Sequence, residues 1–383
     1  MWARLSLLIP VAIVIALVVV FVNTRPFDYL SEGAPPSEQF TVENVRLDDS
    51  GMHLSVRASG AEPMVLAQIQ VDGAYRVFTQ TPPGPVGYLE TVTVDIAYPW
   101  VIGEAHHITL VSSTGTTFDH TIDVAVPTPV PDSGNLAGLA LVGLFVGFVP
   151  ILIGYAFYPA LISFGASGRD FAMALTVGLL VFLLIDAMSE ALDLAGAVAP
   201  GLKGNLVVWL GALITTLVLL AIGRRAGSAP EGPALALFIA IGIGAHNLGE
   251  GLAIGASLAS GEIALASFLV LGFALHNVTE GIAISAPFPR GTASVGKLVG
   301  LALIAGGPAM LGTLSGAVQV APVWNALAFG IGAGAILQVI IEISGAFLRQ
   351  AQKSDTSVFS PVILWGFSTG LIVMYATAIA IQG

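Results

Sequence analysis

The chain has 383 residues, of which 55% are apolar and 10% are charged, and it has no cysteine. With a mean hydropathy of +0.89, this is the composition of a protein with several membrane spans. The absence of cysteine excludes disulfides and thiolate metal ligands, and a net charge of −11 without a basic patch argues against a nucleic acid as partner.

The first 25 residues contain one apolar run, from Leu5 to Val22, with Arg4 before it and Arg25 after it. The run is longer than the usual core of a signal peptide, and no small-x-small cleavage site follows it. We therefore interpret residues 1–25 as an uncleaved membrane anchor whose N-terminus is cytoplasmic. A cleaved signal peptide is the alternative.

Residues 36–127 follow a different pattern, in which apolar and polar residues alternate over short stretches such as 52–57 and 92–96. Turn sequences such as Asp72-Gly73 separate these stretches. The pattern predicts six to eight half-buried strands, and hence a small extracytoplasmic β-sandwich for which immunoglobulin domains are the analogy. We expect its histidines to be ordinary strand-surface residues, with metal collection as the alternative: His53, His106, His107 and His120.

A proline-rich linker, residues 128–134, leads into the apolar remainder, residues 135–383. We interpret its eight apolar runs as membrane-spanning helices near residues 135–158, 171–193, 204–223, 233–257, 262–286, 296–318, 323–348 and 360–381.

The Lys and Arg residues between these runs predict the orientation. With the N-terminus inside, the outer connections contain one of them, Lys203, and the others fall on the inner side: Arg169, Arg224, Arg225, Arg290, Lys297, Arg349 and Lys353. This bias follows the positive-inside rule. We therefore expect a multi-pass protein of the cell membrane, with its β-domain and C-terminus extracytoplasmic.

The fourth and fifth runs contain one phrase twice, His246-Asn247-Leu248-Gly249-Glu250-Gly251 and His276-Asn277-Val278-Thr279-Glu280-Gly281. Residues four apart share a helix face, so each helix presents one imidazole and one carboxylate to one side. The asparagines Asn247 and Asn277 lie about 100° round the helix and could add amide oxygens. The glycine after each glutamate allows a neighbouring backbone to come close.

The two phrases are nearly symmetric about Ile263, so in a helical hairpin the four side chains converge near the middle of the membrane. Their nitrogen and oxygen donors suit a divalent transition metal, with Zn²⁺ the first choice and Fe²⁺, Mn²⁺ and Cd²⁺ also accepted. Buried polar residues that only bond across helices are the alternative. Two intramembrane acids, at a cost of about 2.5–3.5 kcal/mol each, argue against it.

The two phrases resemble the fourth and fifth transmembrane segments of the ZIP (ZRT/IRT-like) divalent-metal transporters. The resemblance covers about residues 135–383 and implies eight transmembrane helices, a metal site between the fourth and fifth, and movement of metal toward the cytoplasm. The chain departs from that family in its sixth span, where Gly307-Pro308 replaces a frequent Glu-Pro pair, so we expect one metal position instead of two. Proline at the fourth position of the motif is replaced by Gly249 and Thr279.

Two other runs carry polar pairs with the i, i+4 spacing of one helix face. Asp186 and Glu190 in the second run are candidates for an entrance path, although Glu190 could simply lie at the water interface. Gln338 and Glu342 in the seventh run are candidates for an exit path or proton relay, with interfacial placement as the alternative.

The sequence thus predicts an anchor helix, a small β-sandwich and an eight-helix ZIP-like bundle. The expected function is alternating-access transport of a divalent metal into the cytoplasm, and a transport-inactive metal sensor or scaffold is the alternative. We do not expect an enzyme, because Asn247 and Asn277 occupy the position of the general base in H-E-x-x-H hydrolases. The expected partners are the metal ion and the lipid bilayer, and a homodimer is left open.

Overall fold

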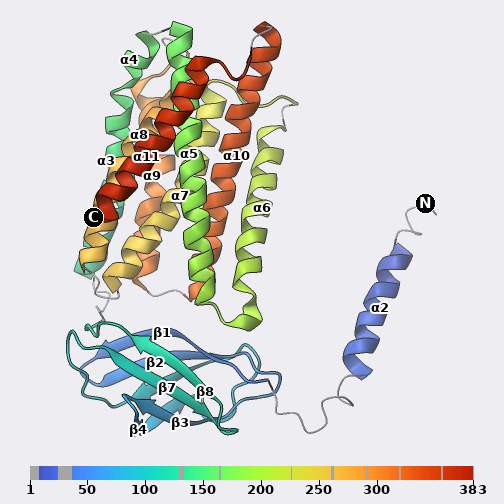
Figure 1. Cartoon of the computed structure of the whole chain (residues 1–383), viewed down its shortest axis with the longest axis vertical. Helices are drawn as coiled ribbons and strands as arrows, with labels where there is room; N and C mark the ends of the chain where they lie inside the picture. The colour runs from blue at the N-terminus through green and yellow to red at the C-terminus, as the bar shows by residue number, and fades with distance from the viewer. Residues whose placement is uncertain are drawn as a thin grey trace.

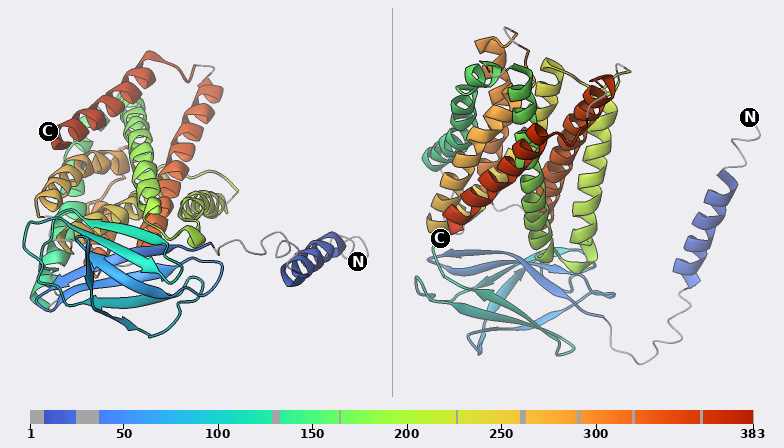
Figure 2. Two further views of the ribbon diagram at one scale, coloured as in Figure 1. Left: turned by 60° about the horizontal axis from the view of Figure 1, so that its bottom comes forward. Right: turned by 45° about the horizontal axis from the view of Figure 1, so that its top comes forward.

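The computed structural model describes residues 8–24, 37–128, 133–163, 165–225, 227–259, 263–289, 292–318, 321–354 and 357–382. An apolar helix, α2 (Leu8–Thr24), is followed by two four-stranded sheets and a bundle of long helices (Figure 1). The sheets lie against one end of the bundle, and α2 lies apart from both (Figures 1 and 2). We call the bundle end beside the sheets the sandwich end and the opposite end the far end.

The sheets form the predicted β-sandwich, with strands β1 (Phe40–Asp48), β2 (Gly51–Ala58), β3 (Leu66–Val71), β4 (Ala74–Arg76), β5 (Phe78–Thr81), β6 (Thr91–Ile96), β7 (His106–Ser112) and β8 (Thr117–Ile122). The antiparallel orders β1-β2-β6-β5 and β4-β3-β7-β8 correspond to the two sheets of an immunoglobulin-type domain, with one strand added. Alternate residues such as Leu54 on β2 and Val94 on β6 are fully buried between the sheets, as the period-2 pattern predicts.

The bundle contains α3 (Ser133–Tyr155), α4 (Tyr158–Ser163), α5 (Gly165–Gly196), the 3₁₀ turn η1 (Pro200–Leu202), α6 (Gly204–Gly223), α7 (Pro233–Ala259), α8 (Ile263–Ser285), α9 (Val295–Ala317), α10 (Pro322–Ser354) and α11 (Pro361–Gln382). Within the described residues, eight helices are long and apolar enough to cross a membrane, which confirms the predicted fold class. The second and seventh helices extend beyond the expected spans 171–193 and 323–348, because a helix continues where the apolar run ends.

Some sequence predictions fall partly outside the described residues. These are Leu5 at the start of the predicted anchor, the flanking residues Arg4 and Arg25, most of the linker 128–134, and Arg290.

Glycine allows several of these helices to pack backbone against backbone. The seam between α7 and α9 is among the tightest, since a Cβ on Gly251 or on Gly312 would lie 2.1 Å from a carbonyl oxygen of the other helix. Close contacts of the same kind join α3 to α8 and α9, α5 to α11, and α6 to α10, through Gly147, Gly154, Gly178 and Gly334. The expected close approach beside the repeated motif is therefore present.

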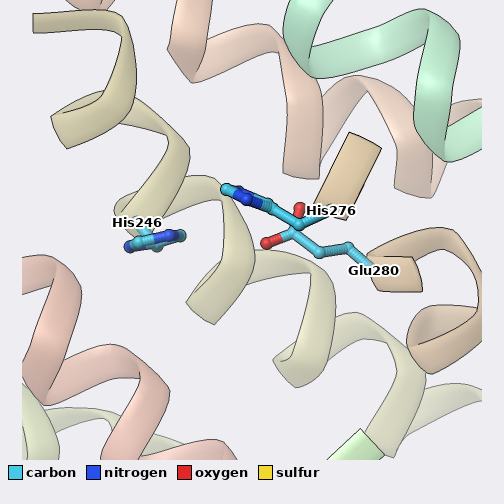
Figure 3. A group of neighbouring side chains, drawn as sticks. All are labelled: His246, His276 and Glu280. Atoms are coloured by element: carbon cyan, nitrogen blue, oxygen red, sulfur yellow. The ribbon is translucent and has the colours of Figure 1, made fainter. Parts of the chain in front are cut away.

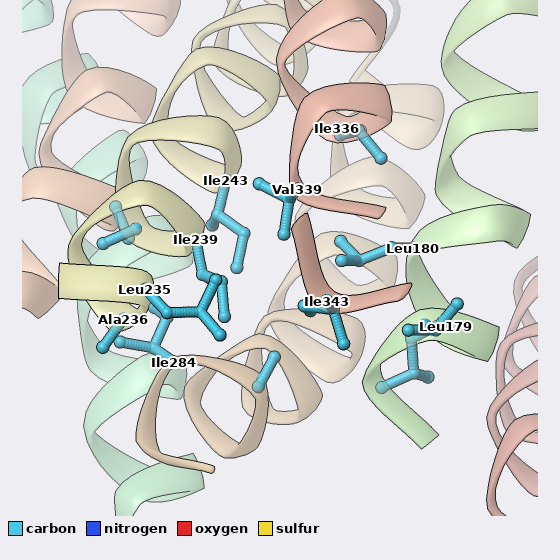
Figure 4. Packing of buried hydrophobic residues seen from close by; sticks show 14 of the residues in the cluster. Leu179, Leu180, Leu235, Ala236, Ile239, Ile243, Ile284, Ile336, Val339 and Ile343 are labelled. Atoms are coloured by element: carbon cyan, nitrogen blue, oxygen red, sulfur yellow. The ribbon is translucent and has the colours of Figure 1, made fainter. Parts of the chain in front are cut away.

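The larger apolar cluster of the bundle fills its far half. It includes Leu180 of α5, Ile239 of α7, and Val339 and Ile343 of α10, which face one another in Figure 4. A smaller cluster, around Phe329 and its neighbours, lies at the sandwich end. The bundle is therefore packed more extensively with apolar side chains on the side away from the sandwich.

The sandwich contacts the bundle at two connections. A Cβ on Gly201 of η1 would lie 2.8 Å from the side chain of Leu89 and 3.0 Å from the hydroxyl of Tyr88. A cavity of about 430 Å³ is lined by β1, β2 and β6 and by Ala321, which precedes α10. The sandwich thus covers the turns between α5 and α6 and between α9 and α10.

We predict that Gly312→Ala destabilises the bundle by about 1–3 kcal/mol, because the new methyl group must push α7 and α9 apart. Gly307→Ala on the same helix is the matched control, since a Cβ there meets no atom within 4 Å. Thermal unfolding of the two variants in detergent would measure the difference. Equal unfolding temperatures would show that the seam does not depend on glycine.

Candidate metal centre

The repeated motif lies at the middle of two helices. His246 is the fourteenth residue of α7 and His276 is the fourteenth residue of α8. Figure 3 shows both imidazoles and Glu280 turned toward one another, and the two ring centroids are 6.3 Å apart. One ligand atom from each of these three residues lies within 4.8 Å of the others, and their exposed fractions are only 2–7%.

Glu250 contacts both imidazoles. Its Oε1 lies 3.0 Å from His246 Nε2, and it accepts a hydrogen bond from His276 Nε2. The two helices are thus joined across the centre by a carboxylate between two histidines. Because metal ligands must be deprotonated, a metal ion would replace the protons that this carboxylate and the imidazoles share.

The side chain of Asn277 is fixed by a neighbouring helix. Its Nδ2 donates to the carbonyl oxygen of Val146 on α3 at 3.0 Å. Four residues later α3 contains Pro150, which has no N–H to donate to that carbonyl. Asn277 therefore satisfies a carbonyl that the proline leaves free, and its own Oδ1 is buried without a hydrogen-bond partner.

Asn247 is held in a similar way. Its Nδ2 donates to the carbonyl oxygen of Ala305 on α9 at 3.1 Å and to Glu280 Oε2 at 3.2 Å. Ala305 lies in the turn before Pro308, the proline inside α9. The amide nitrogen is engaged on both sides, and Oδ1 is again buried and without a partner.

Two further donor atoms around the centre are buried without a hydrogen bond: Glu250 Oε2 and Glu280 Oε1. An unpaired buried polar group costs about 1–3 kcal/mol, so such a concentration needs a physical reason. Two imidazole nitrogens with carboxylate oxygens are a donor set typical of Zn²⁺ and related ions. The residues present therefore fit a divalent metal, and their side chains would have to move closer to bind it at about 2.0–2.2 Å.

The predicted entrance residues lie on α5. Asp186 and Glu190 are exposed, and Asp186 is near enough to interact electrostatically with His246, His276 and Glu250. The structure therefore brings Asp186 beside the centre. It leaves Glu190 farther out, next to Asp186.

The pair on α10 is fully buried. Gln338 and Glu342 have no exposed surface, and Glu342 Oε1 lies 3.3 Å from Arg224 Nε. Both side chains are therefore enclosed by the bundle, and their role in an exit path or proton relay stays a prediction. The position of Arg224 directly after the third predicted span was the signal for this ion pair. The proline inside the first span was the signal for the contact of Asn277 with Val146.

The sandwich histidines are mostly bound to neighbouring side chains. His106 is 3% exposed, and its Nδ1 lies 2.8 Å from Asp72, so its expected place on the strand surface is wrong. The alternation of β7 starts at His106, which points inward. His53 lies between Asp48 and Asp95, and His107 contacts Thr121. Among the described residues, one group of three candidate metal ligands lies close together, and this group is in the bundle and not in the sandwich.

Comparison of the chain with models of known protein families finds no match, and comparison with curated proteins finds none. The resemblance to ZIP transporters therefore stays a prediction that depends on the repeated motif. What the structure adds is a membrane-type bundle with a buried, metal-compatible group of His246, His276 and Glu280.

We predict that Zn²⁺ protects the purified protein against thermal unfolding, by about 2.7 kcal/mol at a hundredfold excess over Kd. His276→Gln and Glu280→Gln should lose this protection because each removes a donor at the centre. His107→Gln, which removes an exposed sandwich histidine, should keep it. Protection that survives both bundle variants and disappears in His107→Gln would place the metal in the sandwich.

Proposed function

We propose that this protein transports a divalent transition-metal ion, Zn²⁺ before Fe²⁺, Mn²⁺ or Cd²⁺, from outside into the cytoplasm through the centre between α7 and α8. One observation carries the proposal: two imidazoles and two carboxylates, all almost fully buried, meet in the middle of two membrane-type helices. Ionisable groups at such a depth are costly and are typical of ion pathways.

The distribution of charge supports the direction. Figure 1 shows η1 and the start of α6 at the sandwich end, and the starts of α5 and α9 and the ends of α6 and α10 at the far end. Lys203 follows η1, whereas the residues at or next to the far helix ends are Arg169, Arg224, Arg225, Lys297 and Arg349. By the positive-inside rule the far end is cytoplasmic, and the sandwich end with the β-domain is outside.

Acidic side chains support an entrance from the sandwich end. Asp186, Glu190 and Asp193 are exposed on the half of α5 that runs from the level of the centre to the sandwich end. Negative groups beside an opening attract cations and raise their local concentration. The far half of the bundle holds the larger apolar cluster, so we expect the metal to reach the centre from the sandwich end.

The chemistry at the centre supports exchange of metal for protons. A cation that binds Glu250, His246 and His276 must displace the protons that hold these groups together. Coordination by the cation would replace the direct contact between Glu250 of α7 and His276 of α8. This gives the metal a direct means of shifting the equilibrium between two arrangements of the helices.

The test is metal uptake into proteoliposomes that hold the full-length protein, with each of the four metals offered separately. We expect saturable Zn²⁺ uptake that falls about a hundredfold or more in Glu250→Ala and in Glu280→Ala. Loss of a residue that only orients a metal ligand typically lowers affinity or activity by about 10–100-fold, and loss of a ligand should cost at least as much. Asp170→Asn, which changes a half-buried carboxylate that accepts a hydrogen bond from Gln350, is the control with unchanged uptake.

Wild-type uptake rates in Glu250→Ala would contradict the proposal. Metal binding without any flux in the wild type would favour the sensor alternative. In that case the close approach of Tyr88 of the sandwich to η1 is where the bundle could act on the β-domain.

A further inference from the structure

The loop between β6 and β7 of the sandwich has an apolar tip. It covers residues 97–105 and turns where the amide of Glu104 donates to the carbonyl oxygen of Val101 at 3.2 Å. Val101 is 51% exposed and Ile102 is 69% exposed. Neither side chain belongs to the apolar core of the sandwich, so their burial is not needed to hold the two sheets together.

A third apolar side chain lies beside them, on the segment that follows β8. Two backbone hydrogen bonds of 2.8 Å join this segment to the turn, since Ala125 bonds to both Gly103 and Glu104. The residue before Ala125 is Val124, which is 57% exposed. Single exposed apolar side chains are common on proteins, whereas a contiguous group marks a contact surface. We call these three side chains the tip patch: Val101, Ile102 and Val124.

Hydrogen bonds at the base of the loop fix the direction of the tip. Trp100 Nε1 donates to the carbonyl oxygen of Asp48 at 2.9 Å, and the hydroxyl of Tyr98 donates to Asp72 Oδ2 at 2.9 Å. Both rings are half-buried against the sandwich. The sandwich thus holds the tip patch outward on a supported loop, and tryptophan and tyrosine beside it are residues typical of the membrane–water interface.

The chain ties the tip patch closely to the first membrane-type helix. Thr128 exchanges two hydrogen bonds with Leu47 of β1, and α3 begins five residues later, at Ser133. At no more than about 3.6 Å per residue, this edge of the sandwich lies within about 18 Å of the start of α3. Val124 is only four residues farther back along the chain. The patch is therefore on the edge of the sandwich that is tethered to a membrane span.

The other end of the sandwich already has a support. Leu89, two residues before β6, approaches Gly201 of η1, whereas the loop with the tip patch follows the opposite end of β6, at Ile96. The strands lie across the sandwich end of the bundle (Figure 1). A contact at the tip patch would support the sandwich at the end that η1 does not reach.

The charged residues next to the patch indicate which membrane surface it fits. In residues 97–105 and 123–128 the charged side chains are Glu104 and Asp123, and both are exposed. Anionic headgroups would repel them, and a polybasic segment that would attract such headgroups is absent from these two stretches. The patch and its neighbours therefore fit a surface of zwitterionic lipids.

We propose that the tip patch inserts into the interface of the membrane leaflet on the sandwich side, with zwitterionic lipid as its partner. The inference does not rest on transport and requires only that the bundle spans a membrane. Together with the contact at η1, insertion gives the sandwich a second support and fixes its tilt over the bundle.

The test uses the absence of cysteine from the chain, which allows one introduced cysteine to be labelled with a fluorescent dye in the full-length protein. Ile102→Cys is compared with Val77→Cys in phosphatidylcholine nanodiscs. Val77 is 90% exposed and lies between β4 and β5, the edge strands opposite β8 and β1. We expect nitroxide-labelled lipid to quench the label at position 102, and iodide in the water to quench it about tenfold less than the label at position 77.

Val124→Cys reports on the patch from its second segment and should behave like Ile102→Cys. Adding Ile102→Ser to Val124→Cys should expose that label to iodide, because loss of one buried isoleucine side chain shifts an insertion equilibrium by about tenfold or more. Replacing half of the phosphatidylcholine by phosphatidylglycerol should weaken insertion by about fivefold for each acidic neighbour. Stronger insertion in the anionic nanodiscs would contradict the assignment to zwitterionic lipid.

Two outcomes would refute insertion. The first is equal quenching by iodide at positions 102, 124 and 77. The second is protection of position 102 from both quenchers, which would show that protein and not lipid covers the patch. A wild type that carries no Zn²⁺ but has a lipid-quenched label at position 102 would refute transport and keep the inserted tip.

Discussion

The contact of Glu250 with two imidazoles, in the middle of a membrane-type bundle, is the interaction on which the arrangement depends. A carboxylate at this depth is tolerated only when its charge is compensated, and here His246 and His276 compensate it from two helices. This requirement fixes how α7 and α8 face each other, because a rotation of either helix would leave the carboxylate or a histidine unpaired. The same groups are the donors that a divalent metal would use.

The neighbouring helices are fitted to the motif through its small residues and amides. Gly251 and Gly281, which follow the two glutamates, bring the backbones of α9 and α3 against the centre. Asn277 and Asn247 bind carbonyl groups near the prolines of the same two helices. One phrase of six residues thus provides the ligands, the close packing and the connection to a proline-containing neighbouring helix, and it does so twice. This explains why a repeat is an economical way to build a centre between two helices.

Much of this could be predicted from the sequence. Hydropathy predicts eight spans, alternation predicts the sandwich, and the i, i+4 spacing places His246 with Glu250 and His276 with Glu280. The contact of Glu250 with His276 could not be derived from spacing within one helix, since it depends on the rotation of α8 against α7. The burial of Glu342 and its pairing with Arg224 depend on how α6 packs against α10. His106 was misplaced because the alternating pattern of β7 fits either face until the register of the sheet is known.

The sandwich gives the bundle an asymmetric environment. It covers the connections beside η1 and Ala321, and its sequence segment carries most of the negative charge of the chain. A cation that approaches from that side meets an acidic domain, then the exposed acids of α5, and then the buried centre. The far half of the bundle is packed mainly with apolar side chains, so the two sides of the centre differ in character.

The most direct test of the metal centre is an experimental structure of the protein with Cd²⁺ at saturating concentration, in which anomalous scattering locates the ion. We expect density within about 2.0–2.5 Å of donor atoms of His246, His276 and Glu280, with the contact between Glu250 and His276 broken or rearranged. An ion bound elsewhere, with that contact intact, would show that the buried polar group only holds the helices together.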